Sequence, residues 1–170
     1  LFTYAQAAQG SHSEEWKVKS PLTSDCRGVQ LDAADNVYML DGRAGVAKYN
    51  ADGKLVWKFV LPVKSQEHVC RAFAVDEEGA VYVGVSEGYP MVDAKLWKYR
   101  VRDAGESVPN QEWEVALDGY VEQVKLRNGY LYAAMNNTST GASRIDVYRL
   151  IDTAVPEIAW SRSQVPYPIN

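Results

Sequence analysis

The feature that most constrains this fold is a hairpin pattern that recurs along the chain. Its clearest copy runs from Gly45 to Val60. Two stretches in which polar and apolar residues alternate flank an Asp-Gly turn there. Each copy pairs a strand ending in an aromatic residue or Leu with a later strand centred on Trp. The four copies are Tyr4–Trp16, Tyr49–Trp57, Tyr99–Trp113 and Leu150–Trp160. Repetition of this kind indicates an array of small sheets and not one mixed core.

A second type of hairpin precedes each of the last three Trp hairpins. These segments are Gly28–Asp41, Ala72–Gly84 and Val121–Ala133. Tyr82 follows Tyr38 by 44 residues, and Tyr132 follows Tyr82 by 50. Four strands in roughly 40 to 50 residues is the pattern of a β-propeller blade, and no stretch shows the period of a helix.

Three stretches carry a recognisable blade motif. They are Leu31-Asp-x-x-Asp-Asn-Val-Tyr38, Val75-Asp-x-x-Gly-x-Val-Tyr82 and Tyr49-Asn-Ala-Asp-Gly-Lys-Leu-Val-Trp57. In these motifs the chain resembles the blades of the NHL and quinoprotein-like (PQQ-repeat) propellers. The resemblance implies a propeller fold over nearly all of the chain. It leaves the function open, because proteins of many unrelated functions share the motif.

The sequence therefore predicts an all-β fold, a partial β-propeller of about three four-stranded blades plus the two outer strands of a preceding blade. The expected units are 1–20 for the incomplete blade, 21–61, 62–118 and 119–163 for one blade each, and 164–170 for a C-terminal linker or edge. We expect the Trp-bearing segments to be outermost strands. Residues expected near blade interiors are Val29, Leu31, Phe73, Val75 and Val124.

Three blades and half of a fourth do not close a ring, because propellers typically have four to eight blades. We therefore expect another polypeptide to complete the ring. This polypeptide is either a sister chain or the rest of a longer precursor. A twisted open array is the alternative, but it would leave apolar blade faces bare at both ends.

The charge balance argues against nucleic acid as a partner. The chain has 18 Lys and Arg against 22 Asp and Glu, a net charge of −4 and a pI near 5.2, so no overall basic field attracts a phosphate backbone. No apolar run approaches the roughly 20 residues that span a bilayer, so no membrane span is expected. An extracytoplasmic or virion-associated location is favoured, although the two cysteines leave the redox compartment open.

Loop length varies on one predicted face of the blades. Strands alternate in direction, so the loop before the first strand and the loop between the second and third lie on the same face. The loops assigned to this face are 20–27, 62–71, 86–94 and 136–143. Such variation marks a binding surface in many repeat proteins. The alternative is that the loops are tolerated insertions, as the long segment 102–110 on the opposite face indicates.

The candidate binding residues of this face are Arg27, His68, Arg71, Tyr89 and Glu122. Arg27 and Arg71 are 44 residues apart, so they begin two neighbouring inner strands at equivalent places. Together their guanidinium groups could hold a carboxylate, a sulfate or a phosphate. Alternatively, they pair with acids such as Asp25, Glu67 or Glu122 and only join the blades. Tyr89, at a loop tip, suits a sugar or a partner protein.

No catalytic pair is indicated by the sequence. Asp32 and Asp76 follow an apolar residue at the first turn of their hairpins, and we interpret them as turn-capping residues, not as general bases. His68 lies beside Cys70 but outside any metal-ligand spacing, so neither a metal nor another cofactor is expected. Cys26 and Cys70 are interpreted as buried small residues.

The favoured function is a non-enzymatic module that binds a protein, a glycan or a small anion, or that acts as a scaffold. The repeats supply structural residues without a repeated or paired catalytic group. One alternative is a fragment of a quinoprotein- or lactonase-like propeller enzyme, although the vicinal cysteine pair of quinoprotein dehydrogenases does not occur in this sequence. The other alternative is a structural component of a virion tail or surface assembly.

Overall fold

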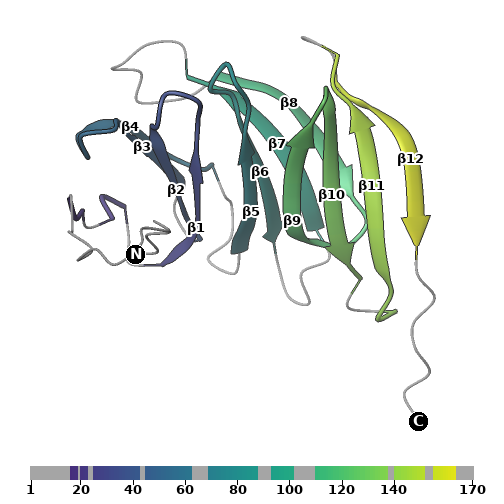
Figure 1. Ribbon diagram of the computed structural model, residues 1–170. Coiled ribbons are helices and arrows are strands. Elements are labelled where there is room, and N and C mark those ends of the chain that lie inside the picture. Colours follow the sequence, from purple (N-terminus) through teal and green to yellow (C-terminus); the bar gives the residue numbers. More distant parts are fainter. Residues whose placement is uncertain are drawn as a thin grey trace, which may run out of the picture.

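All regular secondary structure in the described residues is antiparallel β-sheet. The computed structural model describes residues 16–18, 20–22, 25–42, 45–62, 69–87, 93–101, 110–137, 140–151 and 155–163. These residues form twelve strands and no helix, in three four-stranded antiparallel sheets (Figure 1). The predicted all-β fold of about three four-stranded blades is thus confirmed. The two outer strands expected in residues 1–20 lie largely outside the described residues.

Each sheet is a meander in which the strands follow chain order. Blade 1 contains β1 (Cys26–Leu31), β2 (Val37–Asp41), β3 (Gly45–Tyr49) and β4 (Leu55–Val60). Blade 2 contains β5 (Val69–Val75), β6 (Val81–Glu87), β7 (Asp93–Arg100) and β8 (Asn110–Leu117). Blade 3 contains β9 (Tyr120–Arg127), β10 (Tyr130–Asn136), β11 (Ser143–Arg149) and β12 (Glu157–Ser163).

The first strands of successive blades are neighbours. β1 contacts β5, and β5 contacts β9, whereas β4, β8 and β12 are the last strands of their sheets. Trp57, Trp113 and Trp160 lie on these last strands, as predicted.

Each blade has two faces. We call the face that is directed at the following blade in the chain the forward face, and the opposite face the backward face.

The turns contain the residues that their backbone conformations need. Asp35 (φ 58°) and Asn128 (φ 51°) are in the left-handed region, which Asp and Asn tolerate better than most residues. Gly53 (φ 75°) closes the turn between β3 and β4, where its N–H donates to the Asn50 carbonyl at 2.9 Å. The Asp-Gly turn predicted in the hairpin Gly45–Val60 is therefore present.

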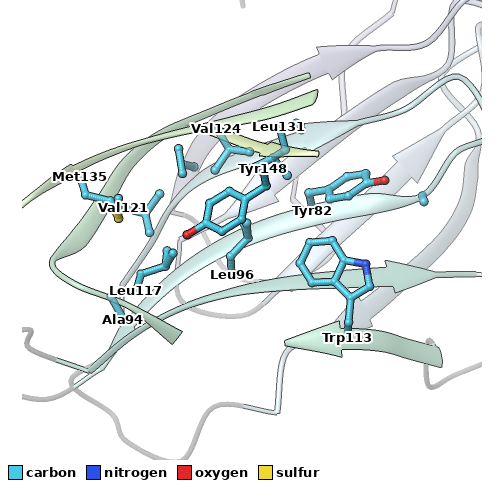
Figure 2. Close-up of a cluster of buried hydrophobic side chains, with 14 residues drawn as sticks. Tyr82, Ala94, Leu96, Trp113, Leu117, Val121, Val124, Leu131, Met135 and Tyr148 are labelled. Atoms are coloured by element: carbon cyan, nitrogen blue, oxygen red, sulfur yellow. The ribbon is translucent and has the colours of Figure 1, made fainter. Parts of the chain in front are cut away.

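Two clusters of buried side chains hold the blades together. The first lies between blades 1 and 2 and includes Tyr38 and Phe73. The second lies between blades 2 and 3, where Trp113 of β8 and Val124 and Tyr148 of blade 3 belong to the same cluster (Figure 2). Burying one large apolar side chain contributes about 1.5 to 3 kcal/mol, so contacts between blades are a main source of stability.

The residues expected near blade interiors divide by blade. Phe73 and Val124 are 5% and 2% exposed, and Val75 packs against the first cluster, as predicted. The prediction is wrong for Val29 and Leu31, which are 59% and 63% exposed. Both side chains belong to the backward face of blade 1. In the part of the chain that is described, no blade precedes β1 to cover them.

Candidate ligand-binding face

A β-bulge occurs at the same place in each innermost strand. The register between the first and second strands shifts at Arg27 in β1, at Arg71 in β5 and at Glu122 in β9. A bulge leaves one extra residue unpaired and re-aims its side chain. Three of the predicted binding residues therefore occupy one equivalent position in the three blades.

The bulges lie close to one edge of the sheets. At this edge the start of each first strand pairs with the end of the second, through the pairs Cys26 with Asp41, Val69 with Ser86, and Tyr120 with Asn136. We call this edge the upper face and the opposite edge the lower face. The strand ends that flank the loops before the first strands and between the second and third strands lie at the upper face, as predicted. His68 and Tyr89, the two other candidates, lie outside the described residues.

Arg27 is engaged by a carboxylate of its own blade. Its Nε lies 2.9 Å from Asp25 Oδ1, and its Nη2 donates to Asp25 Oδ2 at 3.0 Å. The side chain passes over Gly42, where an added Cβ would lie 2.4 Å from Arg27 Cγ. Two of the guanidinium nitrogens are thus committed to Asp25, in the manner of a two-point arginine-carboxylate pair.

Arg71 links blade 2 to blade 3. Its Nη1 lies 3.8 Å from Glu122 Oε1, and its guanidinium carbon lies 5.6 Å from the centre of the Tyr120 ring. Glu122 Oε1 also accepts a hydrogen bond from Asn136 Nδ2 at 3.4 Å. The pair crosses the boundary between blades 2 and 3. This is the geometry expected if Arg71 pairs with an acid and only joins the blades.

The two arginines do not have the same capacity to bind a ligand. The Arg71 side chain is 41% exposed, and its contact with Glu122 is too long for a hydrogen bond. Its N–H groups can therefore donate to a carboxylate, sulfate or phosphate oxygen beside the Tyr120 ring. No contact among the described residues joins Arg27 to Arg71. The geometry thus favours a site around Arg71 and Tyr120 over a clamp formed by both arginines.

Tyr120 and Asn136 are the members of this site that sequence reasoning did not assign. No motif in the sequence marks Tyr120 as a binding residue. Its stacking against Arg71 depends on β9 lying beside β5, which no local pattern reveals. A signal was available for Glu122, because it lies in the strand equivalent to those of Arg27 and Arg71.

Asp32 and Asp76 organise turns on the lower face, as the sequence predicts. Asp32 Oδ1 accepts hydrogen bonds from the backbone N–H groups of Ala34 and Asn36 at 2.9 and 3.0 Å. Asp76 Oδ1 caps its own turn in the same way, accepting from Glu78 and Ala80 at 3.1 and 2.8 Å. These contacts are those of turn-capping carboxylates and leave neither group in the arrangement of a general base.

Hydrogen bonds and burial shift the pKa values of Asp32, Tyr38 and Tyr82 in these turns. Burial opposes ionisation of Asp32, but the bonds from Asn36, Ala34 and Tyr38 outweigh it and lower its pKa to about 2. The Tyr38 hydroxyl donates to Asp32 Oδ2 at 3.1 Å, and Tyr82 donates to Asp76 Oδ2 at 3.0 Å. Burial, and then the neighbouring carboxylate, raises the pKa of each tyrosine. Asp32 and the two tyrosines therefore each keep one protonation state near neutral pH.

A crevice of about 490 Å³ opens on the lower face between blades 2 and 3. Its charged lining includes Lys98 and Arg100, which both bond to Glu112 at 2.7 Å. Arg100 Nη1 also reaches Glu78 at 2.8 Å. Burial raises the pKa of Glu112, but the two cations outweigh it and lower the pKa overall. Lys98 and Arg100 are thus both paired with carboxylates of the chain, so the crevice is not our candidate site.

The two cysteines differ, although their positions are equivalent. Cys70 is buried, and burial raises its pKa to about 12, so its thiol is unreactive near neutral pH. Cys26 is exposed, and its expected burial is wrong because the backward face of blade 1 is open. Within the described residues no group of three His, Cys, Asp or Glu side chains could hold a metal ion. The same residues include no helix that could span a membrane.

Comparison with known proteins adds no family assignment. The chain matches no protein-family model, and no curated protein matches it significantly. The resemblance to NHL and quinoprotein-like blades therefore stays a prediction from the sequence. The function has to be inferred from the surfaces themselves.

Proposed function

We propose that this chain is a non-enzymatic binding and scaffolding module that forms part of a larger propeller ring. Another polypeptide completes the ring. The upper face, with Arg71 and Tyr120 at its centre, binds a protein, a glycan or a small anion. The observation that carries this proposal is the different exposure of equivalent residues in the three blades.

Positions on the backward face of the first strands show this difference most clearly. Phe73 of β5 and Val124 of β9 are 5% and 2% exposed because blades 1 and 2 cover them. Val29 occupies the same position in β1, as the register of the three bulges defines it, and is 59% exposed. An apolar sheet face left bare in this way is a surface that soluble proteins normally cover.

Residues 16–18 and 20–22 already cover the outer part of this backward face. The Trp16 ring lies 6.4 Å from that of Tyr49, and its Nε1 donates to the Ala51 carbonyl at 3.0 Å. Lys58 Nζ donates to the Pro21 carbonyl at 3.0 Å. Tyr49 is consequently buried, whereas Val29 and Leu31 on the inner strand are not. This division supports a preceding blade whose outer half comes from this chain and whose two inner strands come from another polypeptide.

Size-exclusion chromatography with light scattering tests this proposal. We expect the isolated chain to form species heavier than its own 19.0 kDa, because bare apolar residues drive association. Replacing Val29→Lys and Leu31→Lys should shift the mass toward 19.0 kDa. The control Ala116→Lys, at an exposed position of β8 in blade 2, should form species of the same mass as the wild type. A wild-type chain that is a stable, folded monomer at micromolar concentration would contradict the proposal.

A further inference from the structure

No other described strand covers the forward face of blade 3, which lies at the opposite end of the row of blades from β1–β4 (Figure 1). Strand alternation assigns its residues, because Val124, Leu131 and Tyr148 point back into the core shared with blade 2. The register then defines two rows across the four strands. They are Lys125, Tyr132, Val147 and Trp160, and Gln123, Ala134, Ile145 and Arg162.

The centre of this face has the residue types that form the internal interfaces. Tyr132 corresponds to Tyr38 and Tyr82, and Ile145 corresponds to Val46 and Leu96. In blades 1 and 2 these tyrosines and aliphatic residues are at most 2% exposed. Ile145 and Trp160 are 43% and 49% exposed, whereas Val147, which pairs with Trp160, is 1% exposed. The face therefore has the apolar centre of a docking surface that continues the two interfaces within the chain.

Its charges differ from those of the internal interfaces. Lys125 replaces Gln30 and Ala74, and Arg162 replaces Phe59 and Val115. Arg149, in the next row of β11, is a third exposed cation. None of the three forms an ion pair with another described residue. On this face within the described strands, Glu157 is the single carboxylate.

Cations on the covered forward faces do have partners. Lys48 Nζ lies 3.5 Å from Asp32 Oδ2, and Lys98 Nζ lies 2.7 Å from Glu112 Oε2. Arg100 is paired with Glu78 and Glu112. A covered forward face thus neutralises its positive charges, because an unpaired charge is costly to remove from water. The cations of blade 3 need carboxylates from whatever covers them.

We propose that the forward face of blade 3 docks an acidic polypeptide sheet. Its carboxylates would face Lys125, Arg149 and Arg162, and its apolar side chains would cover Tyr132, Ile145 and Trp160. The proposal rests on the proposed function, since the partner is the blade that continues the ring, and it specifies the chemistry of that blade.

A second copy of this chain does not have the required charges. The open backward face of blade 1 presents Val29, Leu31 and Val60 together with the cation Lys58, and its Asp41 is buried. Docking it on blade 3 would bring Lys58 toward a face that is already basic. Nucleic acid is disfavoured because the centre of the face is aliphatic and aromatic, not only charged.

Binding of a labelled synthetic β-hairpin, measured by fluorescence anisotropy, tests the proposal. The probe alternates Glu and Val on two strands joined by Asn-Gly, and its matched control has Lys in place of Glu. A short DNA duplex is the third probe. The measurements use the full chain carrying Val29→Lys and Leu31→Lys, which leaves blade 3 unchanged and removes competition from association through blade 1.

We expect the Glu-Val hairpin to bind and the Lys-Val hairpin not to bind. Replacing Lys125→Glu and Arg162→Glu together should weaken binding at least about tenfold, while Lys58→Glu should not change it. Circular dichroism confirms that each variant keeps its strands. No binding of the Glu-Val hairpin, equal binding of both hairpins, or tighter binding of the duplex would overturn the proposal.

The two proposals fail in different ways. A wild-type chain that is monomeric by light scattering but binds the Glu-Val hairpin through Lys125 and Arg162 overturns the proposed function alone. A wild-type chain that assembles through Val29 and Leu31 but does not bind the hairpin overturns the assignment of blade 3 alone.

Discussion

Blade 2 lies between two neighbours, whereas blades 1 and 3 each have one. Equivalent residues report this difference directly. Cys70 of blade 2 is fully buried and Cys26 of blade 1 is exposed, and Trp113 is 4% exposed where Trp160 of blade 3 is 49% exposed. A repeated residue type thus identifies a position within a blade, whereas its burial depends on the neighbouring blade that covers it.

The two open faces also differ from each other. The backward face of blade 1 is aliphatic at Val29 and Leu31, whereas the forward face of blade 3 has cations around an aromatic and aliphatic centre. They are therefore two different interfaces and not the two halves of one. The following variants compare equivalent residues of covered and open faces, from the largest expected effect to the smallest.

The Trp residues of the outer strands give the largest contrast. We expect Trp113→Ala to lower the free energy of unfolding by about 3 to 5 kcal/mol, because the ring is buried against Tyr82 with ring centres 5.8 Å apart. Trp57→Ala should cost less, since this residue is only partly buried, and Trp160→Ala should cost least. Urea unfolding measures the series. An equal loss of unfolding free energy for Trp113→Ala and Trp160→Ala would show that the difference in exposure does not affect stability.

Gly84 and Ala134 make a second matched pair at equivalent positions of β6 and β10. A Cβ added at Gly84 would lie 2.7 Å from Val121 Cγ1 of the next blade, so Gly84→Val should destabilise the protein by about 1 to 3 kcal/mol. Ala134→Val on the open face of blade 3 should change the stability of the isolated chain by less than about 0.5 kcal/mol. Thermal or urea unfolding of both variants checks this. A large loss for Ala134→Val would mean that its face is already covered.

We expect Asp32 to make the free energy of unfolding depend on pH in blade 1. Blade 3 has a shorter Asn-Gly turn at this place and lacks such a carboxylate. The pKa of Asp32 is lowered from 3.8 to about 2, so the charged form is favoured by folding. The stabilisation, about 2 kcal/mol, is fully present above pH 4 and is lost as pH falls through about 2. Asp32→Asn keeps the capping oxygen and should remove this pH dependence. An unchanged dependence in the variant, measured by urea unfolding across this range, would assign it to other groups.

The smallest effect is expected for the ion pair between blades 2 and 3 on the upper face. Arg71 and Glu122 are 41% and 34% exposed and 3.8 Å apart, so solvent screens their attraction. A double-mutant cycle with Arg71→Ala and Glu122→Ala should give a coupling below about 0.5 kcal/mol. A coupling well above about 1 kcal/mol would make the pair a structural link and weaken the case for a binding role of Arg71.

Much of the fold could be predicted because residues that are close together in the sequence determine the blade motif. The spacing of Tyr38, Tyr82 and Tyr132 locates the second strands. Asp35 and Asn128 mark the turns before β2 and β10, and Gly53 marks the turn between β3 and β4, through left-handed backbone conformations. The exposure of Val29 and Leu31 could not be predicted. Alternation shows which residues share a face, but it contains no information on whether another sheet covers that face.

The candidate site was predictable only in part. The interval of 44 residues identifies Arg27 and Arg71 as equivalent, but it does not show that both are bulge residues. The interval from Arg71 to Glu122 is 51, because longer loops intervene, and this difference hides the third member of the set. Which carboxylate each arginine meets depends on the register and on the neighbouring blade.

The most direct test of the central claim compares the reactivity of the two equivalent thiols. In the monomeric fraction, Cys26 should react with a water-soluble disulfide reagent while Cys70 stays unreactive until the chain unfolds. In the assembled fraction, Cys26 should become as protected as Cys70, because association through the backward face of blade 1 then covers β1. Cys26 that reacts equally fast in both fractions would contradict the claim that the backward face of blade 1 is an interface between blades.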